Sequence, residues 1–180
     1  MKSRPPDPRK LDVAAAAADA LALEGRWPLV GFERLLEAAT QDGVVVWSAT
    51  GQLRHVPGGE PQTWLHLAAN ARVWRDCQRC LHPVALDLEV ARALRFVADE
   101  ATAEALDAES EDDVLALPRW LDLHELVEDE LLLALPLVPM HTHCPEAPRM
   151  SAGLEALESA AADAPRPFAA LAGLKRGAKG

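Results

Sequence analysis

Two segments in the middle of the chain alternate apolar and polar residues with a period of two. The apolar positions of the first segment are Leu65, Leu67, Ala69, Ala71 and Val73. The apolar positions of the second segment are Val84, Leu86, Leu88, Val90, Leu94 and Phe96. Successive side chains of a strand point to opposite faces, so each segment predicts a half-buried strand. We therefore expect a long antiparallel β-ribbon with strands at roughly 63–76 and 83–98.

The N-terminal part of the chain has the composition of helices. Ala and Leu dominate residues 11–24, which predicts a helix that ends at Gly25. Pro28 suits the first turn of a second helix, because proline is favoured at that position. Apolar residues at helical spacing extend this second helix to about Thr40.

Shorter signals fill the region before the ribbon. The β-branched run 44–49 predicts a short strand, and Gly51 predicts a turn after it. Residues 52–56 then suit a return strand, which the Pro-Gly-Gly sequence at 57–59 ends.

A helix is predicted at 122–135. Asp122 and Glu125 form a capping box, in which the aspartate is the N-cap and the glutamate follows three positions later. Pro136 ends the helix. Its carboxylates, such as Glu128 and Asp129, read as a solvated helix face rather than as an acid–base site. We expect the Pro-punctuated segment 136–140 to be extended and packed.

Acidic residues dominate the segment from 99 to 130. It holds thirteen Asp or Glu residues against one basic residue, Arg119. Its first part, about 99–118, has little periodicity and predicts a mobile acidic loop. Such a loop would suit an adaptor that binds a basic partner, for example a ribosomal protein.

These elements predict an α+β fold, in which an antiparallel sheet with a long ribbon is packed by N-terminal helices and the acidic-capped amphipathic helix. Residues 1–10 predict a flexible basic arm, and residues 11–144 a single domain. Residues 145–180 predict a loosely ordered tail with a short apolar segment at 167–171.

Composition limits the function. The net charge of the 180 residues is −10, which argues against a groove that simply tracks nucleic-acid phosphates. Three cysteines form an odd set with one close pair, which indicates reduced thiols in a cytoplasmic protein. No run reaches the ~18 apolar residues of a membrane span.

The close pair, Cys77 and Cys80, is the chemically most distinctive feature of the chain. Its spacing lets two thiolates reach one tetrahedral zinc ion, and Cys144 with His141 or His143 would supply the remaining ligands. The residues alone favour a knuckle of reduced thiols that tightens the turn. A thiol oxidoreductase is a further alternative, but its Cys-x-x-Cys normally begins a helix beside a parallel sheet.

A second candidate is contact with RNA, since arginines cluster around an aromatic residue on the ribbon. Arginine binds phosphate and an interleaved aromatic ring stacks on a base. The alternative is that these arginines only keep the wet face of the ribbon soluble. The candidate contact residues are Arg72, Trp74, Arg75, Arg79, Arg92 and Arg95.

Three fragments together resemble one protein family. They are CQRCLHPV at 77–84, LVEDELLLALPLVPMH at 126–141 with Cys144 just after it, and PFAALAGLK at 167–175. These fragments resemble the YceD family, the large-ribosomal-RNA-subunit accumulation proteins of bacteria and plastids. The resemblance spans roughly residues 60–175.

The resemblance implies a cytoplasmic, non-enzymatic role in the synthesis, processing or stability of the large-subunit (23S) ribosomal RNA. It implies partners among that RNA and its precursor particles, reached directly or through a ribosomal protein. Some branches of the family carry further cysteines near the position of Cys144, which complete a four-cysteine site, whereas this chain has Cys144 alone. A nuclease is the competing enzymatic hypothesis.

Overall fold

The core of the fold is one five-stranded sheet with the strand order β1-β2-β3-β4-β5. This computed structural model describes residues 6–37 and 43–146. The strands are β1 (Ala22–Pro28), β2 (Val44–Arg54), β3 (Gln62–Asp76), β4 (Pro83–Val97) and β5 (Asp113–Ala116). The first four strands pair antiparallel, and β5 joins β4 in parallel. The predicted α+β class with a mostly antiparallel sheet is confirmed.

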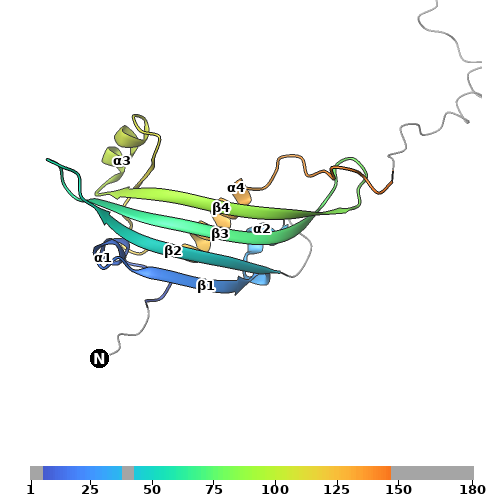
Figure 1. Cartoon of the computed structure of the whole chain (residues 1–180), viewed down its shortest axis with the longest axis horizontal. Helices are drawn as coiled ribbons and strands as arrows, with labels where there is room; N and C mark the ends of the chain where they lie inside the picture. Colours follow the sequence, from blue (N-terminus) through green and yellow to red (C-terminus); the bar gives the residue numbers. More distant parts are fainter. Residues whose placement is uncertain (1–5, 38–42, 147–180) are drawn as a thin grey trace, which may run out of the picture. The chain divides into compact units, whose positions relative to one another are not determined.

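The predicted β-ribbon is confirmed as β3 and β4. Their register runs without interruption from Thr63 opposite Phe96 to Asp76 opposite Pro83. The alternating apolar residues of both strands face the core. Figure 1 shows the ribbon with α3 (Glu100–Asp107) at one end and the β3–β4 loop at the other.

Helices cover one face of the sheet. The helix α1 (Val13–Ala18) packs on β2 and β3, and α4 (Leu123–Leu133) packs on β3 and β4. A 3-10 turn, η1 (Leu29–Gly31), precedes the short helix α2 (Glu33–Glu37), which contacts α4. Leu123, Val127 and Leu131 of α4 are fully buried against this face.

The predicted N-terminal helices are wrong in extent. The Ala-rich segment is helical only at 13–18, and its last three residues, 22–24, belong to strand β1. Gly25 does not end a helix but lies in β1 opposite Trp47, where a Cβ atom would come within 2.8 Å of the indole. Hydrogen bonding to β2 therefore outweighs the helix propensity of Ala and Leu. Pro28 ends β1, and the predicted second helix is replaced by η1 and α2 over its described part.

The predicted turn at Gly51 is also wrong, because β2 continues through it to Arg54 and absorbs the expected return strand. Gly51 instead allows the backbone of α1 to lie close to β2. A Cβ atom at Gly51 would lie 2.4 Å from both the carbonyl carbon and the carbonyl oxygen of Ala16. Only the absence of a side chain lets the backbone of α1 approach the strand so closely.

We expect Gly51→Ala to destabilise the protein by about 1–3 kcal/mol, because backbone atoms of α1 would have to shift. The measurement is the free energy of unfolding in urea. Gly59→Ala is the matched control, since its Cβ atom would meet nothing closer than 3.7 Å and should change stability by no more than about 0.5 kcal/mol. Equal stability of the two variants would contradict the steric argument.

The acidic segment is more ordered than predicted. In place of a mobile loop over 99–118, the structure has the helix α3 and the edge strand β5. Asp99 caps α3 by accepting hydrogen bonds from the backbone and the hydroxyl of Thr102, and Asp107 accepts one from the backbone of Val114. Several of these acidic residues therefore work as local caps.

The helix predicted at 122–135 is confirmed as α4. Asp122 accepts hydrogen bonds from the backbone of His124 and Glu125, as expected for an N-cap. The expectation of a wholly solvated acidic face is wrong, because Glu128 and Glu130 are buried.

The expected basic arm is attached to the domain where it is described. The carbonyl of Pro8 accepts a hydrogen bond from the backbone of Leu123, and Leu11 forms an isolated bridge with Leu121. Residues 6–10 are therefore not a free arm, and residues 1–5 lie outside the described part. The expected tail lies outside it from residue 147 onward. Among the described residues, no helix has the length and apolar character needed to cross a bilayer.

Candidate metal centre

The loop that joins β3 to β4 folds into a tight knuckle at residues 77–82. The backbone N–H of Cys77 donates to the carbonyl of His82 at 2.9 Å, and the N–H of Leu81 donates to the carbonyl of Cys77 at 2.8 Å. The strands β3 and β4 stay paired up to the loop, and their last pair is Asp76 opposite Pro83. The ribbon thereby holds both thiols of the close pair in a bend.

A second segment, which we call the strap and define as residues 136–144, runs from the end of α4 to the knuckle. The backbone N–H of Gln78 donates to the carbonyl of Pro139 at 2.9 Å. The ring of His141 bonds to the carbonyl of Pro83 at 3.0 Å. Two segments about 60 residues apart in the sequence therefore lie side by side at this end of the ribbon (Figure 1).

Three cysteines and one histidine meet at this contact. One ligand atom each from Cys77, Cys80, His141 and Cys144 lies within 4.8 Å of all the others. The sulfur atoms of Cys77 and Cys144 are 3.9 Å apart, and the sulfur of Cys80 is 3.4 Å from Nδ1 of His141. A tetrahedral zinc site with Zn–S bonds of ~2.3 Å has S···S edges of ~3.8 Å and S···N edges of ~3.5 Å. The group is therefore suited to a metal ion such as zinc.

The hydrogen bond of His141 supports the same conclusion. A backbone carbonyl only accepts, so Nε2 of His141 must carry the proton that it shares with Pro83. In the neutral ring the proton-free nitrogen is then Nδ1, which faces the thiols. Metal-binding histidines are commonly fixed in this way by a carbonyl on their other nitrogen.

The electrostatics of the site favour a bound cation. Burial on its own raises the pKa of Cys77. The backbone N–H groups of His141, Cys80 and Arg79 outweigh it and lower the pKa to about 5. Burial and the hydrogen bonds with Cys80 and Cys77 raise the pKa of Cys144 above its usual value. The group therefore holds at least one thiolate at neutral pH, and a cation would relieve the cost of releasing further protons.

The structure distinguishes between the two histidines that were candidate metal ligands. His141 lies in the group, whereas His143 is exposed and outside it. The strap itself is not packed as expected, because Pro139 is the only buried residue among 136–140. Leu137, Val138 and Met140 are exposed instead.

The candidate RNA-contact residues do not form one surface. Arg72 is exposed and makes two hydrogen bonds to Asp87 on the neighbouring strand. Arg92 faces α4, where it bonds to Glu130 at 2.8 Å and approaches Asp113 at 3.5 Å. Arg95 lies opposite Trp64, toward the end of the ribbon far from the knuckle. Only Trp74, Arg75 and Arg79 lie at the knuckle end with neither an aromatic stacking partner nor an ion pair among the described residues.

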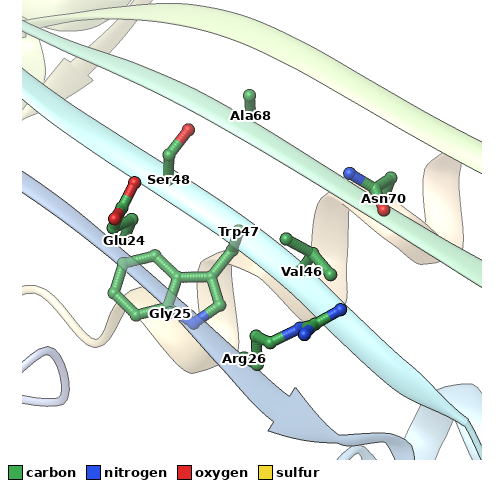
Figure 2. A pocket seen from close by; sticks show the side chains of 8 residues that line it. All are labelled: Glu24, Gly25, Arg26, Val46, Trp47, Ser48, Ala68 and Asn70. Atoms are coloured by element: carbon green, nitrogen blue, oxygen red, sulfur yellow. The ribbon is translucent and has the colours of Figure 1, made fainter.

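A shallow hollow of about 490 Å³ lies over β1 and β2, away from the knuckle (Figure 2). Its polar lining consists of Glu24, Arg26, Ser48 and Asn70. The lining combines one acidic and one basic side chain with a neutral hydroxyl and a neutral amide, and it holds no nucleophile–base pair. It therefore defines no reaction.

Sequence reasoning missed the backbone part of the site. The carbonyl of Pro83 and the N–H groups that surround Cys77 have no sequence signature, because every residue type supplies them. The exposed apolar residues of the strap did have a signal, namely an apolar run broken by two prolines. That run was interpreted as packed.

The fold and the site define an α+β protein in which a group of three cysteines and one histidine ties the tip of a β-ribbon to the segment after a helix. The family described as "Large ribosomal RNA subunit accumulation protein YceD" matches residues 65–175, more than half of the chain. The chain belongs to this family, and all four residues of the group lie inside the matched region.

A curated relative from Haemophilus influenzae, also described as "Large ribosomal RNA subunit accumulation protein YceD", is 40% identical over 103 residues. The match covers 56% of this chain and 59% of the relative, so the chain spans about three fifths of the relative's length. No solved structure is significantly similar to this chain.

Proposed function

We propose that this protein is a non-enzymatic factor in ribosome biogenesis that supports the synthesis, processing or stability of the large-subunit (23S) ribosomal RNA in the cytoplasm. Family membership supports the biological role. The observation that carries the molecular part is the closed group of three cysteines and one histidine at the ribbon tip. Its partners would be the large-subunit RNA or its precursor particles, reached directly or through a ribosomal protein.

The group binds zinc in this proposal, with Cys77, Cys80, Cys144 and Nδ1 of His141 as ligands. Four protein ligands leave no open position for a water or a substrate, which is the pattern of structural zinc rather than catalytic zinc. The ion would clamp the strap to the knuckle and so fix the surface at this end of the ribbon. The proposed RNA or partner contacts are concentrated there, in Trp74, Arg75 and Arg79.

Neither enzymatic alternative gains support from the geometry. A nuclease needs carboxylates free to bind metal ions, but Glu128, Asp129 and Glu130 on α4 are bonded to arginines. A thiol oxidoreductase normally places its first cysteine at the start of a helix. The close pair here lies in the turn of an antiparallel ribbon.

The test is the ratio of large-subunit to small-subunit ribosomal RNA in cells that lack the gene. We expect a lower ratio, because large-subunit RNA would fail to accumulate. Wild-type protein and the His143→Ala variant should restore the ratio, whereas Cys77→Ser should not. An unchanged ratio after loss of the gene would refute the proposed role. Restoration by Cys77→Ser would leave the role but remove the zinc group from it.

A further inference from the structure

Large apolar side chains are exposed around the metal centre. Leu137 of the strap is fully exposed (102%), and Leu81 of the knuckle is 75% exposed. Val138 and Met140 are 54% and 46% exposed. We call these four residues the knuckle patch. Single exposed apolar residues are common, but a group of them on two adjoining segments is typical of an interaction site.

The patch cannot turn inward without breaking the site. The strap is held between the end of α4 and the ligands His141 and Cys144, and the carbonyl of Pro139 is bonded to the knuckle. Pro139 is the residue that packs inward, which leaves its neighbours Val138 and Met140 outside. The two prolines of the strap also restrict its backbone. The apolar side chains are therefore presented on a rigid base.

Leu81 has an unfavourable backbone conformation. Its φ angle is +60°, in the left-handed region where glycine is favoured and other residues cost about 1–2 kcal/mol. Because the side chain of Leu81 is three-quarters exposed, its packing contacts with the described part of the chain offset little of this cost. The cost is understandable if the side chain of Leu81 contributes to a contact with another molecule.

Positive charge adjoins the patch. The guanidinium of Arg79 lies 3.8 Å from the sulfur of Met140, and neither Arg79 nor Arg75 forms an ion pair within the described part of the chain. Arg34, Arg72 and Arg92, by contrast, are all paired with carboxylates. The carboxylate nearest in sequence is Asp76, which is exposed. The surface therefore complements apolar groups flanked by negative charge.

We propose that the knuckle patch docks a protein partner whose contacting segment carries aliphatic side chains flanked by Asp or Glu. Met and Arg are both enriched in the cores of protein–protein interfaces. A surface that stacks unpaired RNA bases would present exposed aromatic rings, whereas none of the four patch residues is aromatic and Trp74 on β3 is half-buried. The proposal rests on the proposed function, since the metal centre holds the patch in place.

The test uses the full-length chain in living cells. The photo-crosslinking residue benzoylphenylalanine replaces Leu137, and the crosslinked peptide is identified by mass spectrometry. We expect a peptide of another protein that contains aliphatic residues next to Asp or Glu. The control places the same residue at Leu115, which is 40% exposed on β5 at the opposite end of the ribbon and should not yield that peptide.

Two variants make the test specific. Leu81→Gly removes the backbone cost, so the protein should be at least as stable as wild type, yet the crosslink from position 137 should fall about tenfold. Arg79→Glu should also reduce it about tenfold, because the charge next to the patch is reversed. Bound zinc and thermal unfolding verify that both variants are folded.

Several outcomes would overturn the inference. These are a crosslink to RNA, to residues 147–180 of the same chain or to a second copy, no crosslink at all, a peptide without acidic residues, or a crosslink yield in either variant equal to that of the wild type. The ribosomal RNA ratio distinguishes this failure from failure of the proposed function. If the ribosomal RNA ratio falls on loss of the gene but the expected crosslink is not found, only the docking proposal is contradicted. If the expected crosslink is found but the ribosomal RNA ratio does not change, only the proposed ribosomal role is contradicted.

Discussion

Replacing Cys77 with Ser is expected to abolish zinc binding and to lower the stability of the protein. The wild-type chain should contain about one zinc ion, because the ligand atoms of the four residues lie within 4.8 Å of one another, at spacings that suit a tetrahedral site. Cys77 is the fully buried ligand, and the backbone N–H of His141 donates to its sulfur at 3.4 Å. A serine hydroxyl does not ionise at neutral pH and is a poor zinc ligand, so the variant should retain almost no metal.

The loss of stability is expected because metal binding and folding are thermodynamically linked. An ion that binds only the folded state at a free concentration one hundredfold above its Kd stabilises that state by ~2.7 kcal/mol. The thermal midpoint of the wild-type protein should therefore fall on addition of a chelator. The midpoint of Cys77→Ser should be lower from the start and should not respond to the chelator. Metal analysis and calorimetry of the purified full-length proteins measure both effects.

The histidines provide the matched comparison. His141→Ala should lose zinc, because the Nδ1 ligand and the hydrogen bond from Nε2 to the carbonyl of Pro83 disappear together. His143→Ala changes the same residue type two positions away and should bind zinc as the wild type does. If both histidine variants bind zinc equally, or if the purified wild-type chain binds none, the metal assignment is wrong.

How much of this site could be predicted from the sequence depends on how local each part is. The spacing of Cys77 and Cys80 and the alternating strands on either side predict the knuckle, because both signals lie in one continuous stretch of sequence. The choice of His141 over His143 depends on how the strap lies against Pro83. That alignment is set by the packing of α4 on the sheet, and no local pattern records it.

The errors in the fold have the same origin. Ala and Leu at residues 20–23 favour a helix locally, but the chain turns after α1 and enters β1 at Ala22, because β2 offers an edge to pair with. The sequence pattern predicts that Gly25 ends a helix and that Gly51 lies in a turn. Both are in fact places where another part of the molecule comes too close for a Cβ atom, the indole of Trp47 in one case and the backbone of α1 in the other. Such tertiary constraints are invisible to propensity.

The acidic residues of α4 show how burial changes the meaning of a charge. The pattern of Glu128, Asp129 and Glu130 predicts a solvated face, yet Glu128 is only 7% exposed. One of its oxygens accepts hydrogen bonds from the backbone N–H groups of Arg34 and Leu35, and the other from the side chain of Arg34. These N–H groups belong to the first turn of α2. Glu128 therefore acts as the N-terminal cap of a helix more than 90 residues away in the sequence.

We expect Glu128→Ala to lower the free energy of unfolding by about 3 kcal/mol, because it leaves two backbone donors of α2 and the guanidinium of Arg34 without their acceptor. Glu128→Gln should cost less, since its amide keeps one oxygen for the backbone donors. Asp129→Ala is the control, because Asp129 pairs with the same arginine but is about half exposed, and such pairs contribute about 1 kcal/mol or less. Urea unfolding of the three variants gives the comparison. Equal losses in Glu128→Ala and Asp129→Ala would mean that the buried carboxylate is only one more surface charge, and that α2 is held to α4 by its apolar contacts alone.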